Sequence, residues 1–448
     1  MHSIRFRRLS PARAALLTVA VLIAPLAAQA QQPPADPDRQ SLLDRIEQLE
    51  KRLSDLESSA VLSEPETRVK RVEVYVDANG NEHDEPVAGA KKTVTYQRER
   101  VFRRQTISEK IDEAIGDQES KSVKLGINAA MVTQYVSQDQ GADNPADGHA
   151  YALASADLFF MANLAQNTSL YANVVGLSGS PPDSEVGGLT LLNGYAARLK
   201  AQDQLYLREA WLRTELFNQK LALNVGRLDL TAFFDRNAAA NDETTQFVSD
   251  ALVNNPMLGL SSNGAGLAAV YDPRGSFNFK IGVQQSNPDS LNLSEAMYSL
   301  AEIGYRARPS FLGEGNYRAW FRTDNSTGRQ LGAYGVSLDQ KLTPIITLFA
   351  RFGSGEVEGP GSPDDRFYST GLQFSNGWVF NRQDVWGLGY ARTELAADQK
   401  EDLLEAYYNM HLSDKLRLSF HLQHTTETAA DSSKQGFFVP GIRLQAGL

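Results

Sequence analysis

The sequence predicts a transmembrane β-barrel of 16 antiparallel strands, preceded by a short α-helical coiled coil and a β-hairpin. The chain of 448 residues has a mean hydropathy of −0.35, and beyond its N-terminus no apolar run reaches the roughly 18 residues of a helical span. From residue 122 onward, segments of about ten residues alternate apolar with polar side chains. The connections between these segments are alternately short and long, as in barrels with turns on one side of the membrane and loops on the other.

The composition excludes several classes of function. Lys and Arg number 44 against 54 Asp and Glu, a net charge of −10, so no nucleic-acid partner is expected. The absence of cysteine excludes disulfides, thiolate metal sites and cysteine nucleophiles. The 20 phenylalanines and 16 tyrosines are too many for a disordered chain.

Residues 1–30 are expected to be a secretory signal peptide. They combine arginines near the start, an apolar run from Ala14 to Ala28, and the small-x-small exit Ala28-Gln29-Ala30. The alternative is a membrane anchor, which is disfavoured because the run has only about 15 residues and a bilayer needs about 20. We therefore expect export of the mature chain.

Residues 31–60 are predicted to form a periplasmic coiled coil, because apolar residues recur at alternating spacings of four and three. The seam consists of Leu42, Ile46, Leu49, Leu53 and Leu56, and the flanking g and e positions hold Arg45, Arg52, Glu50 and Glu57. The resulting spacing Arg-apolar-x-x-apolar-Glu occurs twice and resembles a motif of three-stranded parallel coiled coils. We therefore expect a homotrimer; the alternative is an ordinary amphipathic helix that packs on its own domain.

Residues 61–121 are predicted to be a charged hairpin and linker. Val72, Val74 and Val76 alternate with polar residues before the turn at Asn79-Gly80, and residues 93–102 alternate again. We favour a solvated hairpin in a periplasmic stalk. Contact with peptidoglycan is the alternative, because the segment is mildly basic.

Residues 122–448 are predicted to form the barrel. The 16 candidate strands lie near 123–136, 150–164, 168–178, 203–217, 219–229, 264–272, 276–286, 297–308, 314–324, 328–339, 345–354, 366–376, 384–394, 403–412, 415–424 and 437–446. Short connections follow even strands and longer ones mostly follow odd strands, for example 137–149, 230–263 and 425–436. An even strand count with both chain ends in the periplasm produces this order.

The alternation also predicts which side chains face lipid. Ala319 and Phe321 alternate with polar and aromatic residues, and other strands repeat the pattern. An arginine facing lipid at mid-membrane costs about 2–4 kcal/mol, so arginines in these strands are expected to face the lumen. The predicted pore wall contains Arg318, Trp320, Arg322, Arg351 and Arg417.

The longest connection, residues 230–263, follows the fifth strand and is the third external loop. Loops of this length are usually functional, and we expect this one to fold inward, narrow the pore and contain a short helix capped by Asn241 or Asp242. A flat external lid is the alternative. The residues predicted at the constriction, opposite the arginine wall, are Arg227, Asp229, Asp235, Arg236, Asp242 and Glu243. Alternatively, Arg227 and Asp229 form a structural ion pair at the loop base.

This loop resembles the carbohydrate-selective porin family of the OprB type. The matching stretches are Gly226–Asp229, Phe233–Asn237, Ala240–Glu243, Gln246-Phe247, Asn254–Pro256 and, late in the barrel, Val385–Ala391. The resemblance extends over roughly residues 122–448 and implies a diffusion channel, often trimeric, for sugars or other small solutes. The N-terminus departs from the family pattern, because a coiled coil and hairpin stand where a surface-layer-homology-like domain would be, so wall anchoring by such a domain is not implied.

We therefore expect an outer-membrane porin, a passive diffusion channel for sugars or ions, surrounded by outer-membrane lipid and with its stalk in the periplasm. The guanidinium groups of the arginines near Trp320 can donate hydrogen bonds to sugar hydroxyls, and equally to phosphate or carboxylate solutes. The alternative function is a structural tether that links the membrane to the cell wall. No enzyme, cofactor or metal site is predicted, because no constellation of nucleophile, base and orienting residue is recognisable.

Overall fold

The computed structural model describes residues 65–76, 82–83 and 91–102 by their backbone. It also describes residues 123–447 except 166, 199–204, 261, 274, 287–295, 310–311, 327, 358–363, 376–380 and 382. The chain divides into two compact units, Met1–Arg52 and Leu53–Leu448, and all described residues belong to the second. The predicted signal peptide and coiled coil lie outside the described residues. Among the helices in this part of the chain, none is long and apolar enough to cross a membrane.

A small antiparallel sheet forms within the predicted hairpin segment. Its strands are β1 (Pro65–Val76), β2 (Glu82–His83) and β3 (Lys91–Phe102), in the order β2-β1-β3. β1 pairs with β3 along its whole length, from Pro65 opposite Phe102 to Val76 opposite Lys91. The hairpin is thus longer than the alternating residues alone suggested.

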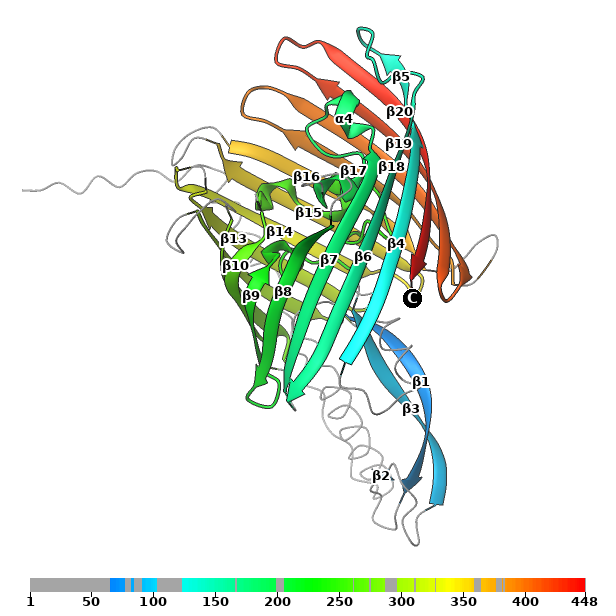
Figure 1. The fold of residues 1–448 in the computed structure, drawn as a ribbon, viewed down its shortest axis with the longest axis vertical. Helices are drawn as coiled ribbons and strands as arrows, with labels where there is room; N and C mark the ends of the chain where they lie inside the picture. The colour runs from blue at the N-terminus through cyan, green and yellow to red at the C-terminus, as the bar shows by residue number, and fades with distance from the viewer. Residues whose placement is uncertain are drawn as a thin grey trace, which may run out of the picture. The chain divides into compact units, whose positions relative to one another are not determined.

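The remaining strands close into one antiparallel barrel (Figure 1). β4 (Val123–Tyr135) and β5 (Ser137–Gln140) are interrupted only at Val136 and both pair with the last strand, so they act as the first barrel strand. The other 15 are β6 (Ala150–Ala165), β7 (Thr168–Ser180), β8 (Leu205–Leu216), β9 (Leu221–Leu228), β10 (Gly264–Tyr271), β11 (Phe277–Gln285), β12 (Met297–Ala307), β13 (Gly315–Asp324), β14 (Leu331–Lys341), β15 (Ile346–Glu356), β16 (Asp364–Phe374), β17 (Val385–Glu394), β18 (Lys400–Ser413), β19 (Leu416–Thr428) and β20 (Lys434–Gly447). The predicted barrel of 16 strands is confirmed.

One predicted loop is much shorter in the structure. The connection expected at 425–436 shrinks because β19 continues to Thr428 and β20 begins at Lys434. The ladder pairs Thr425 with Phe437 and Thr428 with Lys434. Polar residues here extend the strands beyond the apolar band, where alternation alone does not mark them as strand.

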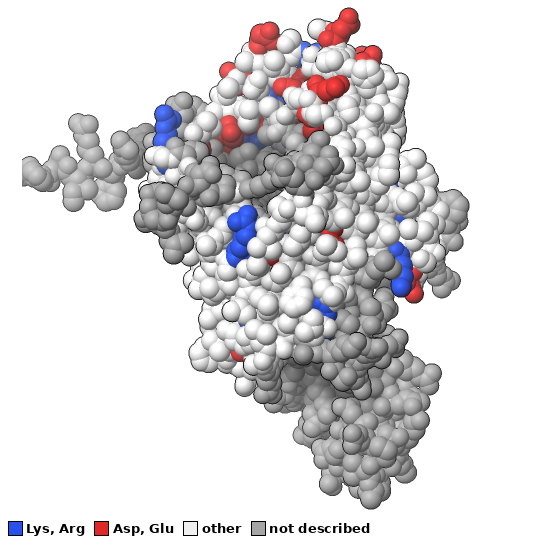
Figure 2. Space-filling view, in the orientation of Figure 1, with Lys and Arg blue, Asp and Glu red and all other residues white. Residues whose placement is uncertain are grey.

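The barrel wall is apolar outside and polar inside. In β19, Phe420 and Leu422 are exposed while Ser419, His421 and Gln423 between them are buried. Figure 2 shows a mostly uncharged wall on the visible face, with Asp and Glu gathered at the end where β5 and α4 (Asp183–Val186) lie. An apolar outer wall with charge at its margin suits a surface that contacts lipid.

The lumen is filled in large part by two loops. The connection between β7 and β8, which we call the second loop, contains α4 and the 3-10 helix η3 (Gly194–Arg198). The third contains η4 (Leu230–Ala232), α5 (Asp250–Val253) and η5 (Pro256–Leu258). Apolar side chains of both loops join a buried cluster with inward-facing wall residues, such as Phe247 against Phe349 and Tyr407. Others, among them Tyr195 and Val248, belong to a second buried cluster.

The helix of the third loop begins later than predicted. Ser249, and not Asn241 or Asp242, is the residue before α5. Asp242 instead closes a turn, because its carboxylate accepts hydrogen bonds from the Thr244 N–H at 2.8 Å and the Thr245 hydroxyl at 2.6 Å. Asp side chains bond readily to backbone two residues on, and this local bond replaces the expected helix cap.

Candidate functional site

Asp235 anchors the third loop to the wall near the start of the loop. Its carboxylate accepts hydrogen bonds from Trp320 Nε1 and from Arg351 Nε, both at 2.7 Å, and its own N–H donates to Glu302 at 2.7 Å. Arg351 also donates to the carbonyl of Leu252, at 3.0 Å. Burial is complete, with side-chain exposures of 0% for Arg351 and 2% for Asp235. A single buried cluster therefore joins both halves of the loop to β12, β13 and β15.

Glu405 of β18 holds the apex of the loop. Its two oxygens accept hydrogen bonds from the N–H groups of Val248 at 2.8 Å and Ser249 at 3.0 Å, immediately before α5. His421 Nδ1 lies 2.8 Å from the same carboxylate, and Gln423 donates to it at 3.2 Å. A wall residue thus satisfies the N–H groups of the two residues before α5, and the first N–H of α5, that of Asp250, donates to Leu191 of the second loop.

Further bonds extend the anchoring around the barrel. Lys280 of β11 donates to the carbonyl of Phe233 at 2.9 Å, and Asn409 of β18 to that of Thr245 at 2.7 Å. Arg443 of β20 donates to the carbonyl of Glu243 at 2.5 Å. The loop leaves the wall at β9 and returns at β10, so contacts from β11 to β20 mean that it crosses the lumen.

The second loop packs over the third. The N–H of Gly194 donates to the carbonyl of Val248 at 2.7 Å, and the N–H of Asp250 donates to that of Leu191 at 2.9 Å. A Cβ at position 194 would lie 3.1 Å from the Val248 oxygen and 3.2 Å from the Glu243 Cβ, so the close approach favours glycine. Glu401 of β18 holds this loop by accepting from the N–H of Leu189 at 2.7 Å.

The predicted arginine wall faces inward, but most of it is covered and paired. Arg318 pairs with Asp339 at 3.2 Å and Arg322 with Asp324 at 3.3 Å, while Arg351 pairs with Asp235. All three arginines are less than 9% exposed. A guanidinium that loses its water needs a counter-charge, so the expected open row of positive charge is replaced by buried ion pairs. Arg417 is half-buried at the start of β19, four positions before His421.

An open cavity of about 250 Å³ remains beside β8 and β9. Its charged lining residues are Arg208, Arg227, Asp229, Glu243 and Asp250, and its neutral polar lining includes Asn254, Asn255, Ser262 and Asn263. Loops two and three supply most of this lining, and Arg208 and Arg227 come from the strands. The cavity carries both signs of charge.

The structure brings together three of the six residues predicted at the constriction. Arg227, Asp229 and Glu243 line the cavity, whereas Asp235, Arg236 and Asp242 are buried in bonds that shape the loop. The alternative ion pair between Arg227 and Asp229 is replaced by one between Arg208 and Asp229, at 3.1 Å. Arg227 Nε instead donates to the carbonyl of Leu207, at 3.0 Å.

The predicted site residues do not include Arg208, Glu302 or Glu405, although Glu302 and Glu405 alternate with outward-facing apolar residues in their strands. Glu302 binds both Lys280, at 2.8 Å, and the loop. Arg208 sits at a register shift in β8, between the pairs Val174–Leu207 and Asn173–Glu209. A bulge changes which face a side chain occupies, so simple alternation does not assign Arg208 to the lumen.

Comparisons with known proteins agree with this architecture. Residues 146–326 match the family described as "Carbohydrate-selective porin, OprB family". An uncharacterized protein of Aquifex aeolicus is 28% identical over 218 residues, which are 49% of this chain and 63% of that protein. Porin AaxA of Chlamydia trachomatis serovar D is 27% identical over 183 residues, 39% of each chain. The chain thus spans less than two thirds of the length of these curated relatives.

Solved structures share the fold. The high-pH structure of Pseudomonas putida OprB superposes with a TM-score of 0.63 at 15% identity, covering 75% of this chain and 96% of that one. The low-pH structure of the same protein gives a TM-score of 0.52. The family match over residues 146–326 and the porin relatives make this chain similar to the carbohydrate-selective porins of the OprB type, and the solved structures share its barrel fold.

Proposed function

We propose that this protein is an outer-membrane porin through which small hydrophilic solutes diffuse passively, along a path that the third loop narrows. The observation that carries the proposal is the mixed-charge cavity left between the loops and β8–β9 inside a closed barrel. Selectivity in a pore follows from its diameter, its lining charges and its hydrogen-bond partners. Here those partners are amide, hydroxyl, guanidinium and carboxylate groups within one cavity.

We propose neutral polyhydroxylated solutes, sugars above all, as the preferred cargo. A sugar hydroxyl can accept from Arg208 or Arg227 and donate to Asp229, so a cavity with both kinds of group suits it. A strongly anionic solute would meet carboxylates there, while the arginines beneath the third loop are already paired. The family description, which names carbohydrate, supports the same choice.

The test is single-channel recording of the purified protein in planar bilayers, with sugars added as blockers. We expect stable current steps that neutral sugars block in a dose-dependent way. The variant Asn263→Ala, which changes a polar lining residue without changing charge, should weaken block. Gln435→Ala, on β20 outside the cavity, is the matched control. Silence at all voltages would contradict the channel and favour the tether, which predicts tight co-sedimentation with peptidoglycan.

We further propose that the protein is a homotrimer whose N-terminal stalk lies in the periplasm after removal of the signal peptide. The support is the heptad pattern of residues 42–57 with its paired arginines and glutamates. Mass measurement of the detergent-solubilised protein tests it, and a monomeric mass would contradict it.

A further inference from the structure

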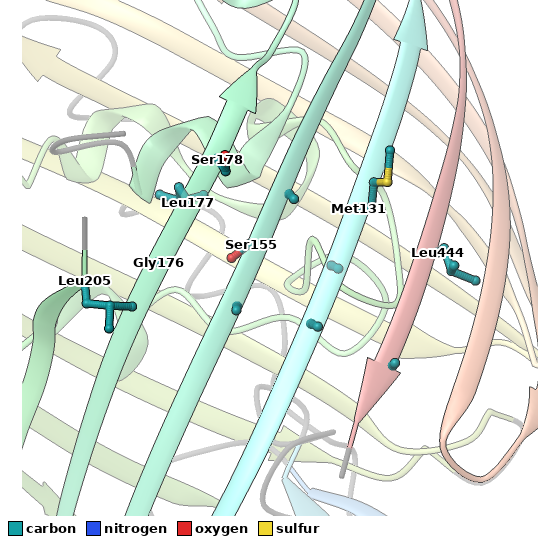
Figure 3. Close-up of a pocket in the computed structure, with 12 residues that line it drawn as sticks. Met131, Ser155, Gly176, Leu177, Ser178, Leu205 and Leu444 are labelled. Carbon is teal, nitrogen blue, oxygen red and sulfur yellow. The ribbon is translucent and has the colours of Figure 1, made fainter. Parts of the chain in front are cut away.

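The pairing between β8 and β9 ends early on the external side of the barrel. The last pair of this ladder is Ala210 opposite Arg227. β8 continues beyond that pair to Leu205, and along this stretch the structure pairs it with β7 only. Figure 3 shows Leu205 next to the strand that is labelled at Gly176, its partner on β7. We call the unpaired stretch between the upper parts of β8 and β9 the β8–β9 gap.

Side chains take the place of strand pairing at the β8–β9 gap. Arg227 Nε donates to the carbonyl of Leu207 at 3.0 Å, and Asn263 Nδ2 donates to the carbonyl of Arg208 at 3.1 Å. On the inner side, Arg208 pairs with Asp229 at 3.1 Å. Both arginines line the cavity of about 250 Å³ described above, so the cavity lies at the gap.

Arg227 stands on the outer face of the wall, although it lines the same cavity as Arg208. Exposed and buried residues alternate along β9, with Val225 52% exposed and Leu228 completely buried, and Arg227 shares the face of Val225. In the row across the strands, Arg227 lies between Ala210 and Ala265. Alanine has no side-chain atom beyond Cβ, so neither neighbour covers the guanidinium.

Arg227 also lies in the external half of the wall. It is the next-to-last residue of β9 (Leu221–Leu228), which begins after the short connection from β8. A rise of about 3.3 Å per residue and a tilt of about 40° place it about 15 Å above the start of the strand, in an apolar band about 25 Å tall. Its bond to Leu207, nearer the external end of β8 than Ala210, directs the side chain toward the external headgroups, as is usual for long basic side chains.

The charge of Arg227 is not balanced within the part of the chain that the structure describes. Among those residues, the carbonyl of Leu207 is its hydrogen-bond partner and no carboxylate pairs with it. Arg392 of β17, which also faces outward, differs because its Nε and Nη2 donate to Asp402 at 2.6 Å and 3.0 Å. Charge on the lipid face of a barrel is costly. An anion from outside the chain would therefore stabilise Arg227 more than Arg392.

We propose that the β8–β9 gap binds the phosphate group of an outer-leaflet membrane lipid through Arg227. With Nε occupied, the guanidinium still presents its two terminal amino groups, and such planar donors bind phosphate well. Val225 and Leu207, 52% and 45% exposed, provide apolar surface beside the arginine for the acyl chains. A phosphorylated solute in the cavity would present the same group, but this apolar, membrane-facing surface favours the lipid.

The test is native mass spectrometry of the purified protein in an uncharged detergent, titrated with diphosphoryl lipid A. We expect saturable binding that is at least about tenfold weaker in Arg227→Gln, because a charge-assisted pair is lost. Arg392→Gln is the matched control, since it removes an outward-facing arginine that already has a partner, and it should bind like the wild type. Arg227→Lys keeps the charge and should restore part of the affinity. The heat-dependent shift on gels confirms that each variant is folded.

Inorganic phosphate and an uncharged galactolipid separate the possible ligands. Lipid A that stays bound in excess inorganic phosphate, together with no binding of the galactolipid, would support the lipid site. Displacement of lipid A by an equal concentration of inorganic phosphate would assign the site to a free phosphate and overturn the proposal. Equal affinities of the wild type and Arg227→Gln, or equal losses in both glutamine variants, would also overturn it. Binding is measured without current, so the result does not depend on whether the channel conducts.

Discussion

At the scale of single residues, buried charge pairs determine how the lumen is arranged. A buried pair is weak evidence of net stability, but the loss of one partner leaves the other charge uncompensated at a cost of about 3–5 kcal/mol. Arg351 has no exposed side-chain surface and bonds to Asp235 and to the carbonyl of Leu252. Its role is to position the loop, although the sequence pattern predicted a pore-lining charge.

Asp235→Ala should destabilise the folded barrel by about 3–5 kcal/mol and raise single-channel conductance, because Arg351 loses its counter-charge and the loop its anchor. Chemical denaturation and bilayer recording measure the two effects. Asp402→Ala is the control, because its pair with Arg392 is 33–42% exposed and should contribute at most about 1 kcal/mol. Equal losses in the two variants would refute the anchoring role.

Asp229→Asn should shift the reversal potential in a salt gradient toward anions, because the cavity then keeps Arg208 and Arg227 with one carboxylate fewer. Asp414→Asn, in a turn where the side chain is 78% exposed, should change it little because salt screens that charge. If neither variant shifts the potential, ions do not pass through this cavity.

At the scale of elements, the third loop behaves as part of the core of the barrel. Its apolar residues pack on the inner wall, and one wall carboxylate, that of Glu405, accepts hydrogen bonds from two N–H groups at its apex. The second loop depends on it, through the bonds of Gly194 and Asp250. Local unfolding should therefore begin in the second loop and reach the third loop only afterwards.

Glu405→Gln keeps the shape of the side chain but replaces one acceptor oxygen by an amide donor, so it cannot accept from both Val248 and Ser249. We expect faster hydrogen exchange in residues 247–253 and more frequent current fluctuations. Glu401→Gln is the matched control on the same strand, since it should loosen only residues 189–190 of the second loop. Unchanged exchange at 247–253 would show that apolar packing alone holds the apex.

The second loop should dock more weakly as pH rises from about 4 through neutrality. Burial raises the pKa of Asp183 in α4 to about 7, and the nearby charge of Asp250 adds to the shift. A carboxyl whose pKa is raised on docking takes up a proton there. Its contribution to docking is complete below the ordinary pKa of 3.8, and is lost as pH rises through the docked pKa of about 7. Hydrogen exchange of residues 183–198, corrected for intrinsic rates, should be slower at pH 6 than at pH 8. Asp183→Asn should abolish this difference; a difference that persists would assign it to another group.

At the scale of the whole molecule, closure of the barrel pairs every strand from β4 to β20 with a neighbour on both sides, so the proposed association of copies would have to use the outer wall or the N-terminal segment. The strands from β4 to β20 form one closed ladder. Folding of the barrel and the proposed association of copies should therefore be separable by substitution.

Replacing Ile46 and Leu53 together with Asp should weaken or abolish the trimer while leaving the barrel folded, because both occupy a positions of the predicted seam. Sedimentation measures the mass, and the heat-dependent shift of the barrel on gels reports its folding. Gln48→Asp, at the outward c position, should leave the trimer intact. A trimer that survives the double substitution would show that the barrels associate without the heptads.

The sequence by itself determined the barrel, its strand count and the faces of its strands, because alternation with period two is a local property that burial imposes on every strand. It also located the third loop and the residues Arg227, Asp229 and Glu243. Only the tertiary structure decided which charges face open space. Asp235 lies 116 positions from Arg351, and Val248 lies 157 from Glu405. No local pattern records such pairs, because closing the barrel brings them together and burial then forces each charge to find its partner.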